Sequence, residues 1–214
     1  MEDSTARIDT YTSASSEASA EPASDFELIK ASKLGDQQSF DVLLMKYGGR
    51  VHNHCRRMVD DEAECADLTQ EVFLKVYRNL ANYEHAYSFY TWLYRITVNT
   101  CIDHMRKKRR RISEVSLTHS DYSERWDSGS EQEISDETYC PEDRMQNLEL
   151  GAEITRAMEK LPARLRSYII LKDVEGFTYS EIATVFDCSP GTVKSSLFNA
   201  RQKLKMLLSR SMYN

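Results

Sequence analysis

The sequence predicts an all-helical protein made of two helical domains joined by a flexible acidic linker. Of the 214 residues, 41% are hydrophobic and 29% are charged, while only seven are glycine and four are proline. This composition suits helical globular domains better than a turn-rich sandwich. Apolar residues recur at helical spacing in residues 25–112 and 148–214, with no sustained period between them. The length suits two compact domains.

Charge divides the chain in the same way. Residues 1–24 have a net charge of −4, and residues 25–112 have +3. Residues 113–147 hold ten acidic residues and two basic ones, whereas residues 148–214 return to +3. The whole-chain charge of −6 therefore hides two mildly basic segments on either side of a strongly acidic one.

The first domain is expected to contain four helices. Residues 1–24 are rich in Ser, Ala, Thr and Glu and predict a disordered tail. Asp25 can cap a first helix that ends at Gly35, and Asp36 can cap the second. The second helix is the clearer one, because its apolar residues fall on one face. These residues are Phe40, Leu43, Leu44, Tyr47, Val51 and Met58.

The third helix is expected from about Glu62 to Leu80, and the fourth runs from about Ser88 into the basic run 106–111. The buried face of the third helix is predicted to carry Cys65, Leu68, Val72, Val76 and Leu80. The acidic and amide residues on its outer edge are read, from charge alone, as a solvated face.

Residues 113–147 predict a flexible linker, because Ser, Asp and Gly stand between the charges. A helix is then expected from about Glu142 to Leu161, and another begins near Pro162, a residue suited to the first turn of a helix. The second of these is expected to end at Gly176.

The last two helices have the pattern of a helix-turn-helix. Thr178 and Glu181 have the spacing of a capping box for a short helix, and Ser189 can cap a longer one after a tight turn. The polar face of the last helix includes Thr192, Lys194, Ser195, Asn199 and Gln202. Such a face can be a plain solvated surface, but its position in the motif favours binding in the major groove of duplex DNA.

The fourth helix carries an unusual number of aromatic residues. Phe89, Trp92, Leu93 and Ile96 form one stripe, for which burial is the better interpretation. Other aromatic and polar residues lie on a second face or in the preceding loop: Tyr83, Tyr87, Tyr90, Tyr94, Arg95 and Asn99. Aromatic rings among cations and amides can stack on unpaired bases, although tyrosines are also often half-buried for packing.

Other classes of function find little support. No nucleophile with a base, pair of carboxylates at a plausible site or Gly-rich phosphate loop is present, so the sequence does not predict an enzyme or a cofactor. A metal site is rejected because His52, His54 and Cys55 do not share one helical face with Cys65. No apolar stretch is long enough for a membrane helix, no secretory signal is evident and the five cysteines are scattered, which predicts a cytoplasmic protein with reduced thiols.

Three segments occur in a recognisable order: DLTQEVFLKVYRNL, then SFYTWLYRITVNTCIDHMRKKRRR and, after the acidic linker, LPARLRSYIILKDVEGFTYSEIATVFDCSPGTVKSSLFNARQKL. Together they resemble bacterial sigma factors of the extracytoplasmic-function group over about residues 25–208. The resemblance implies a first domain (25–112) that binds the clamp of core RNA polymerase and melts the downstream promoter element. It implies a last domain (148–214) that reads the upstream element, a role in a stress response, and an anti-sigma factor as a further partner.

The same resemblance assigns site residues. Binding to core polymerase falls on Asp67, Leu68, Gln70, Glu71 and Phe73. Contacts to the downstream element and its melted strand fall on Tyr83, Tyr87, Tyr90, Trp92, Tyr94, Arg95 and Asn99. Contacts to the upstream element fall on Thr192, Lys194, Ser195, Phe198 and Asn199.

The chain departs from many relatives at Ser196 and Asn199, where arginine is frequent, and fewer cations on that face predict weaker phosphate anchoring. The long acidic linker is implied to thread the nucleic-acid channel of the polymerase. The alternative is a conventional regulator that binds duplex DNA with its second domain and senses a signal or dimerises with its first. Promoter binding with and without core polymerase distinguishes the two.

Overall fold

The computed structural model describes residues 24–115 and 143–212, with side chains described in 24–111 and 150–209. Every regular element in these ranges is helical. The first domain consists of α1 (Asp25–Lys33), α2 (Gln37–Met58), α3 (Glu62–Asn79), the 3-10 turn η1 (Leu80–Asn82) and α4 (Phe89–Val115). The second consists of α5 (Asp143–Glu159), α6 (Ala163–Ile169), the π-helical turn η2 (Ile170–Val174), α7 (Tyr179–Phe186) and α8 (Pro190–Met212).

The helical fold is confirmed. Residues 113–115 continue α4 into the predicted linker, and α5 begins at Asp143, close to the expected start at about Glu142. The remainder of the predicted linker, 116–142, and residues 1–23 of the predicted tail lie outside the described residues.

Polar caps set the helix boundaries largely as predicted. Asp36 accepts a hydrogen bond from the backbone N–H of Gln38, and Thr178 forms a capping box with Glu181. The first helix is capped one residue earlier than expected, since the extended backbone of Ser24 lets its hydroxyl accept from the N–H of Glu27.

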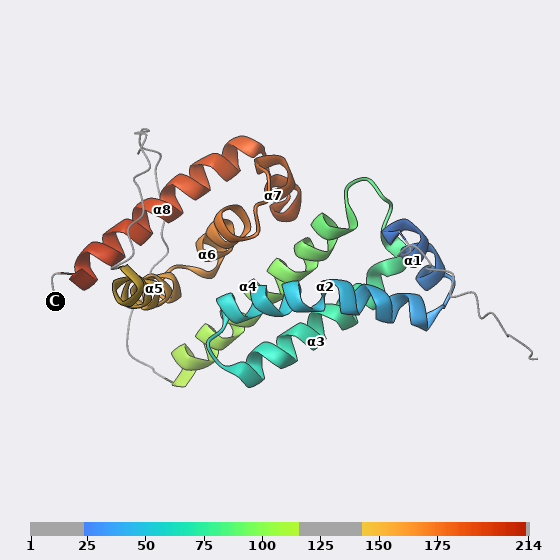
Figure 1. The fold of residues 1–214 in the computed structure, drawn as a ribbon, viewed down its shortest axis with the longest axis horizontal. Helices are drawn as coiled ribbons and strands as arrows, with labels where there is room; N and C mark the ends of the chain where they lie inside the picture. The colour runs from blue at the N-terminus through green and yellow to red at the C-terminus, as the bar shows by residue number, and fades with distance from the viewer. Residues whose placement is uncertain (1–23, 116–142, 213–214) are drawn as a thin grey trace, which may run out of the picture.

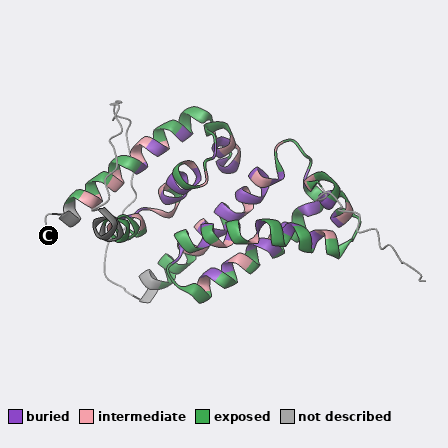
Figure 2. Cartoon of the chain, viewed as in Figure 1, coloured by how far each residue is buried: buried purple, intermediate pink, exposed green. Residues whose placement is uncertain are grey.

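The first core lies among α1, α2, α3 and the beginning of α4. The face of α2 is buried as predicted at five positions, but Leu44 is 39% exposed, so its expected burial is wrong. A residue one position after Leu43 is turned about 100° around the helix, which takes Leu44 out of the core and towards solvent. Figure 2 shows the buried residues along the facing sides of the helices.

The second core is shared between the two domains. Tyr94 and Val98 of α4 pack with Tyr168, Phe177 and other apolar residues of the second domain. Ile170 of η2 in turn joins the core of the first domain. The second domain therefore lies along α4, as Figure 1 shows, with α6 and α7 nearest to it. None of the described helices combines the length and apolarity needed to cross a bilayer.

Candidate partner and nucleic-acid interfaces

The predicted partner-binding residues of α3 form an exposed stripe over a buried support. Asp67, Gln70 and Glu71 are exposed and share one face, because positions three and four apart are neighbours on a helix. The carboxylate of Glu71 pairs with Nζ of Lys75 at 2.8 Å, and this bond lowers the pKa of Glu71. Leu68 is 1% exposed and supports the stripe from the core rather than forming its surface.

An apolar groove of about 460 Å³ runs beside this stripe between α2 and α3. Phe73, otherwise buried, forms part of its wall. Leu74 and Tyr77 also line the groove, and both are more than half exposed. Sequence reasoning missed Leu74, although it lies seven residues after Asp67, a spacing that continues the same stripe.

The loop between α3 and α4 is held in place by α1. Nζ of Lys33 donates to the backbone carbonyl of Tyr83, and the Tyr83 hydroxyl donates to the carbonyl of Tyr87 at 2.7 Å. Tyr83 is 4% exposed, so it shapes the loop and offers little surface. His85 has a φ of 57°, and its ring contacts those of Phe26 and Tyr83.

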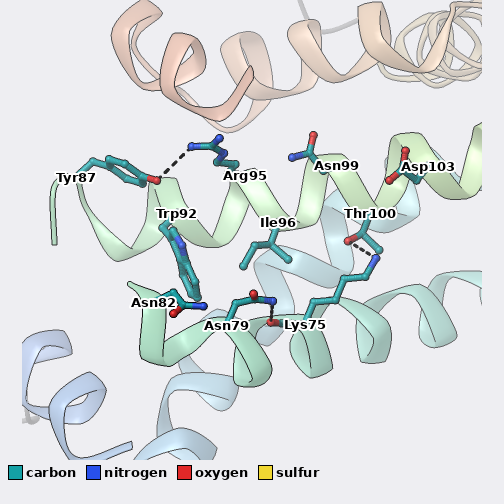
Figure 3. A pocket seen from close by; sticks show the side chains of 10 residues that line it. All are labelled: Lys75, Asn79, Asn82, Tyr87, Trp92, Arg95, Ile96, Asn99, Thr100 and Asp103. Carbon is teal, nitrogen blue, oxygen red and sulfur yellow. Dashed lines mark hydrogen bonds between the residues drawn. The ribbon is translucent and has the colours of Figure 1, made fainter. Parts of the chain in front are cut away.

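A second groove of about 340 Å³ lies between α3 and α4, and Figure 3 shows its lining. Four residues predicted for the melted strand meet here: Tyr87, Trp92, Arg95 and Asn99. Residues from α3, η1 and α4 complete the lining: Lys75, Asn79, Asn82, Ile96, Thr100 and Asp103. Nη1 of Arg95 donates to the Tyr87 hydroxyl at 3.5 Å, which places a cation beside an aromatic ring at the mouth of the groove. Rings, a cation and amides in one groove can stack on and hydrogen-bond an unpaired base.

The other two tyrosines of the set lie elsewhere on α4. Tyr94 is 0% exposed, so the expectation that it lies outside the buried part of α4 is wrong, whereas Tyr90 is half-buried. The reason is the second domain, which covers this face. Phe177 stacks on Tyr90 with ring centroids 5.1 Å apart and meets Tyr94 at 4.9 Å.

Glu175 of the second domain also contacts the face of α4 that carries Tyr90 and Tyr94, which we call the covered face. Its Oε2 accepts hydrogen bonds from the Tyr94 hydroxyl at 2.8 Å and the Tyr90 hydroxyl at 3.3 Å. Its Oε1 lies 3.9 Å from Nη1 of Arg57. Burial raises the pKa of both tyrosines, so both remain neutral donors at ordinary pH.

His54 lies fully buried beneath the covered face, with its ring edge-on to Tyr94 at 5.4 Å. Neither ring nitrogen has a hydrogen-bond partner among the described residues. Burial lowers the pKa of His54 to about 3, and the nearby Arg57 cation acts in the same direction.

Arg166 anchors the second domain, and sequence reasoning missed it. The side chain is 2% exposed, and Nη1 donates to the carbonyl of Met58, at the end of α2, at 3.0 Å. A cation at the C-terminus of a helix is favoured by the helix dipole. No sequence signal separates this arginine from a solvated one, because its burial depends on how the two domains pack.

The helix-turn-helix is formed by α7 and α8. Asp187 takes the left-handed conformation, with φ 53°, at the tight turn, and the Ser189 hydroxyl accepts from the N–H of Thr192 at 3.1 Å. Thr192, Lys194 and Ser195 are exposed in the first turns of α8. The other two predicted residues, Phe198 and Asn199, are partly buried. The exposed groups thus gather at the N-terminal end of α8, where such helices contact base edges.

Within the side chains that the structure describes, no group of three or more His, Cys, Asp and Glu residues has the geometry of a metal site. Cys55, Cys65, Cys101 and Cys188 are free thiols, and Cys140 lies outside the described residues.

Two family profiles match this chain. Residues 43–111 match sigma-70 region 2, and residues 151–204 match sigma-70 region 4. The first range contains α3, η1 and most of α4, and the second contains α6, α7 and most of α8. The matched segments therefore include all three predicted surfaces.

Close relatives are found over most of the chain. The RNA polymerase sigma-H factor of Pseudomonas aeruginosa is 35% identical over 184 residues, covering 86% of this chain and 93% of that protein. The ECF RNA polymerase sigma-E factor of Escherichia coli K12 is 36% identical over 187 residues, covering 86% and 94%.

Two solved structures share the fold at 23% identity. One is CnrH in complex with the cytosolic domain of CnrY, with a TM-score of 0.60 over 87% of this chain and 97% of that one. The other is the sigma factor RpoE in complex with the anti-sigma factor NepR from Bartonella quintana, with a TM-score of 0.57 over 80% and 98%.

Proposed function

This chain belongs to the sigma-70 family as a sigma factor of the extracytoplasmic-function group, and on that premise we propose how its three surfaces divide the work of starting transcription. As a sigma factor it binds core RNA polymerase and directs it to promoters, and it is not an enzyme. We assign region 2 to residues 25–112 and region 4 to residues 148–214. We expect it to act in the cytoplasm and in a stress response.

The stripe on α3 is proposed to bind core polymerase. Its residues Asp67, Gln70 and Glu71 are exposed, and the apolar groove beside them offers a surface for a helical partner. Charged groups at a rim orient a partner, while the apolar part holds it once water is expelled. Leu74 belongs to the same contact, since it is 55% exposed at the junction of stripe and groove.

Charge reversal on this stripe tests the assignment. Asp67→Lys with Glu71→Lys should abolish holoenzyme formation in a pull-down with core polymerase and leave the melting temperature close to wild type, because both residues are exposed. Glu153→Lys with Glu159→Lys on α5 is the matched control for the change in net charge. Normal holoenzyme formation by the α3 variant removes the stripe from the polymerase contact.

The groove between α3 and α4 is proposed to hold an unpaired base of the downstream element, and this groove is the observation that carries the function. A factor that opens promoters needs a place for a base outside the duplex, whereas a regulator that binds only duplex DNA does not. The partly exposed Tyr87 and the largely buried Trp92, which is 9% exposed, line the groove with aromatic rings. Arg95 and Asn99 offer hydrogen-bond donors at the same groove. Its volume of about 340 Å³ falls within the range of small-molecule sites.

Promoter opening tests this assignment. Holoenzyme with Arg95→Ala and Asn99→Ala should form closed complexes but show reduced permanganate reactivity of unpaired thymines at a promoter mapped by transcription in vitro. A template already mismatched over the melted region should restore transcription if the groove creates single strands, and restore little if it holds them. Undiminished reactivity on intact duplex means that the groove takes no base.

The N-terminal turns of α8 are proposed to read the upstream element. Asn199→Ala should change which upstream sequence is preferred, because pairing of an amide with adenine is worth about 1–3 kcal/mol of discrimination. Lys194→Ala should weaken binding to all sequences and flatten the salt dependence if this side chain meets phosphate. An equal loss on every template for Asn199→Ala shows that Asn199 does not read bases.

An anti-sigma factor is proposed as a further partner. Family membership supports this proposal, and both solved structures of the same fold contain a bound partner, which is named an anti-sigma factor for RpoE. Co-purification of the chain with a protein that prevents holoenzyme formation tests it.

A further inference from the structure

We propose that Cys55 and Cys101 form a site of reversible oxidation, where a hydroperoxide converts the two thiols to a disulfide that bonds α2 to α4 and weakens binding at the groove between α3 and α4. The oxidation depends only on the contact between the two sulfurs. Its effect on DNA rests on the proposed role of the groove in holding an unpaired base.

The two sulfurs lie in contact in the core of the first domain. Sγ of Cys55 on α2 is 3.8 Å from Sγ of Cys101 on α4, and both residues are 0% exposed. The other two described thiols have different surroundings: Sγ of Cys65 lies 3.6 Å from Nδ1 of His52, and Cys188 belongs to the second domain. Cys55 and Cys101 are therefore the pair that is placed to join.

The contact also makes the two thiols unequal in acidity. With Cys101 as the donor, its S–H binds the sulfur of Cys55, which lowers the pKa of Cys55 and raises the pKa of Cys101. Burial acts in the opposite direction on Cys55, but the hydrogen bond has the larger effect. Because a thiol reacts as its thiolate, Cys55 is the residue that attacks and Cys101 the one that completes the bond.

The reaction takes two steps. The thiolate of Cys55 attacks one oxygen of the hydroperoxide, the O–O bond breaks, and the released alkoxide takes up a proton to leave as an alcohol. The sulfur of Cys101 then bonds to the sulfenic acid on Cys55, the S–O bond breaks, and the hydroxyl leaves with the proton of Cys101 as water. Two thiols and one hydroperoxide thus give one disulfide, one alcohol and one water.

Burial decides which oxidant can act on the pair. Because neither sulfur is exposed, an oxidant has to enter through a local opening of the fold. Hydrogen peroxide is little larger than water and needs only a small opening. Oxidised glutathione is a disulfide between two tripeptides and needs a large one. We therefore expect the pair to respond to hydrogen peroxide and to stay reduced in the presence of oxidised glutathione.

The disulfide acts on α4 next to the groove. A disulfide holds its sulfurs about 2 Å apart, so Cys55 and Cys101 must move closer than their present 3.8 Å. Cys101 directly follows Thr100, which lines the groove and accepts a hydrogen bond from Nζ of Lys75 on α3 at 3.2 Å. Movement of this part of α4 towards α2 lengthens that bond and changes the spacing of the groove walls.

Peroxide treatment of the full chain tests the oxidation. The reduced chain is treated with hydrogen peroxide and digested without reductant, and peptide mass spectrometry should find Cys55 joined to Cys101 in most chains. The bond closes a long loop of the chain, so it should raise the melting temperature by about 5 °C or more until dithiothreitol is added. Oxidised glutathione should produce neither change.

Binding of a single strand by holoenzyme tests the effect on the groove. The probe is a labelled non-template strand from a promoter mapped by transcription in vitro. Holoenzyme assembled with the oxidised chain should bind it about fivefold more weakly than holoenzyme with the reduced chain, the loss expected for about one hydrogen bond. Dithiothreitol should restore the affinity, which separates the disulfide from oxidised methionine, since a sulfoxide requires its own reductase.

Single-cysteine variants make the result specific. Cys101→Ala removes one sulfur of the pair, so peroxide should neither cross-link this variant nor change its strand affinity. Cys55→Val removes the other sulfur and tests the same point if Cys101→Ala does not fold. Cys188→Ala is the matched control, because it removes a thiol of the second domain and should leave both responses to peroxide intact.

Three results overturn the proposal. Recovery of Cys55 as a sulfinic acid without a cross-link means that Cys101 is out of reach, and a cross-link that forms only in urea means that the folded core excludes peroxide. A cross-link that leaves strand affinity unchanged means that the bond does not act on the groove. Failure of the proposed function is distinguishable, because reduced wild-type holoenzyme would then bind the strand no better than holoenzyme with Asn99→Ala, whatever the state of the thiols.

Discussion

The two faces of α4 differ in what covers them. One face forms a groove with α3 that is open to solvent and is lined by Tyr87, Trp92, Arg95 and Asn99. The other carries Tyr90 and Tyr94 and is closed by Phe177 and Glu175. These six residues were predicted for one task, yet Asn99 is exposed and Tyr87 and Arg95 are partly exposed, whereas Trp92 lies largely in the first core and Tyr94 is fully buried. The sequence can therefore contain every residue of a predicted binding surface while the fold buries some of them.

The two faces differ because apolar residues of the second domain pack against only one of them. Phe177 and Tyr168 of this domain join a core that includes Tyr94 and Val98 of α4. Burying a large aromatic side chain stabilises a fold by about 1.5–3 kcal/mol relative to its exposure, so this contact is substantial. At the open groove, Asn99 is exposed and Arg95 is partly exposed.

The largest expected difference between the two faces is in stability. Tyr94→Ala should lower the free energy of unfolding by about 3–5 kcal/mol, because it removes a fully buried ring. Asn99→Ala on the open face should change it by no more than about 0.5 kcal/mol. Urea unfolding followed by circular dichroism measures both. Tyr94→Phe is the control that keeps the ring, and similar values for the Tyr94→Ala and Asn99→Ala variants contradict the burial of Tyr94.

The second expected difference is in how stability depends on pH, because the covered face has the buried His54 beneath it. The folded-state pKa of His54 is about 3, against about 6.5 in the unfolded chain, so the unfolded state takes up a proton first as the pH falls. Stability is therefore lost below about pH 6.5, at about 1.4 kcal/mol per pH unit, until the folded state is itself protonated near pH 3. At about pH 5 the loss from this one residue is about 2 kcal/mol.

His54→Leu should remove this part of the pH dependence. Unfolding free energies measured from about pH 7 to about pH 5 should show a shallower slope for the variant than for the wild type. His85→Leu, which removes an exposed imidazole from the loop before α4, is the matched control. Parallel curves for wild type and His54→Leu mean that His54 is not buried as a neutral side chain.

The smallest difference concerns direct binding on the open face. Asn99→Ala should weaken binding of a labelled single strand by about 1 kcal/mol, the value of a typical hydrogen bond. Tyr90→Ala should change this binding less, because Phe177 stacks on the Tyr90 ring and covers it. If Tyr90→Ala has the larger effect in an otherwise wild-type chain, the roles of the two faces are reversed.

Local patterns were enough to predict the helices. The capping groups of Asp36, Thr178 and Ser189 act within three residues of themselves, so their roles can be found from spacing alone. The stripe on α3 is equally local, since Asp67, Gln70 and Glu71 share a face whatever surrounds them.

The covering of α4 could not be predicted in this way. Tyr94 and Arg166 look like solvated or half-buried residues when each helix is considered alone, and they become buried only when domains far apart in sequence meet. Periodicity gives the face of a helix but not the identity of what packs on it. The pocket on the other face has the same origin, because Lys75 and Asn79 of α3 reach it from a separate helix.

Nitration of tyrosines in the free chain by tetranitromethane, followed by peptide mass spectrometry, tests the covering of α4 most directly. Tyr94 should be as protected as Tyr168, since both are almost fully buried. Tyr87, which is partly exposed at the open groove, should react. Nitration of Tyr94 as fast as that of Tyr87 would contradict the covering of this face by the second domain.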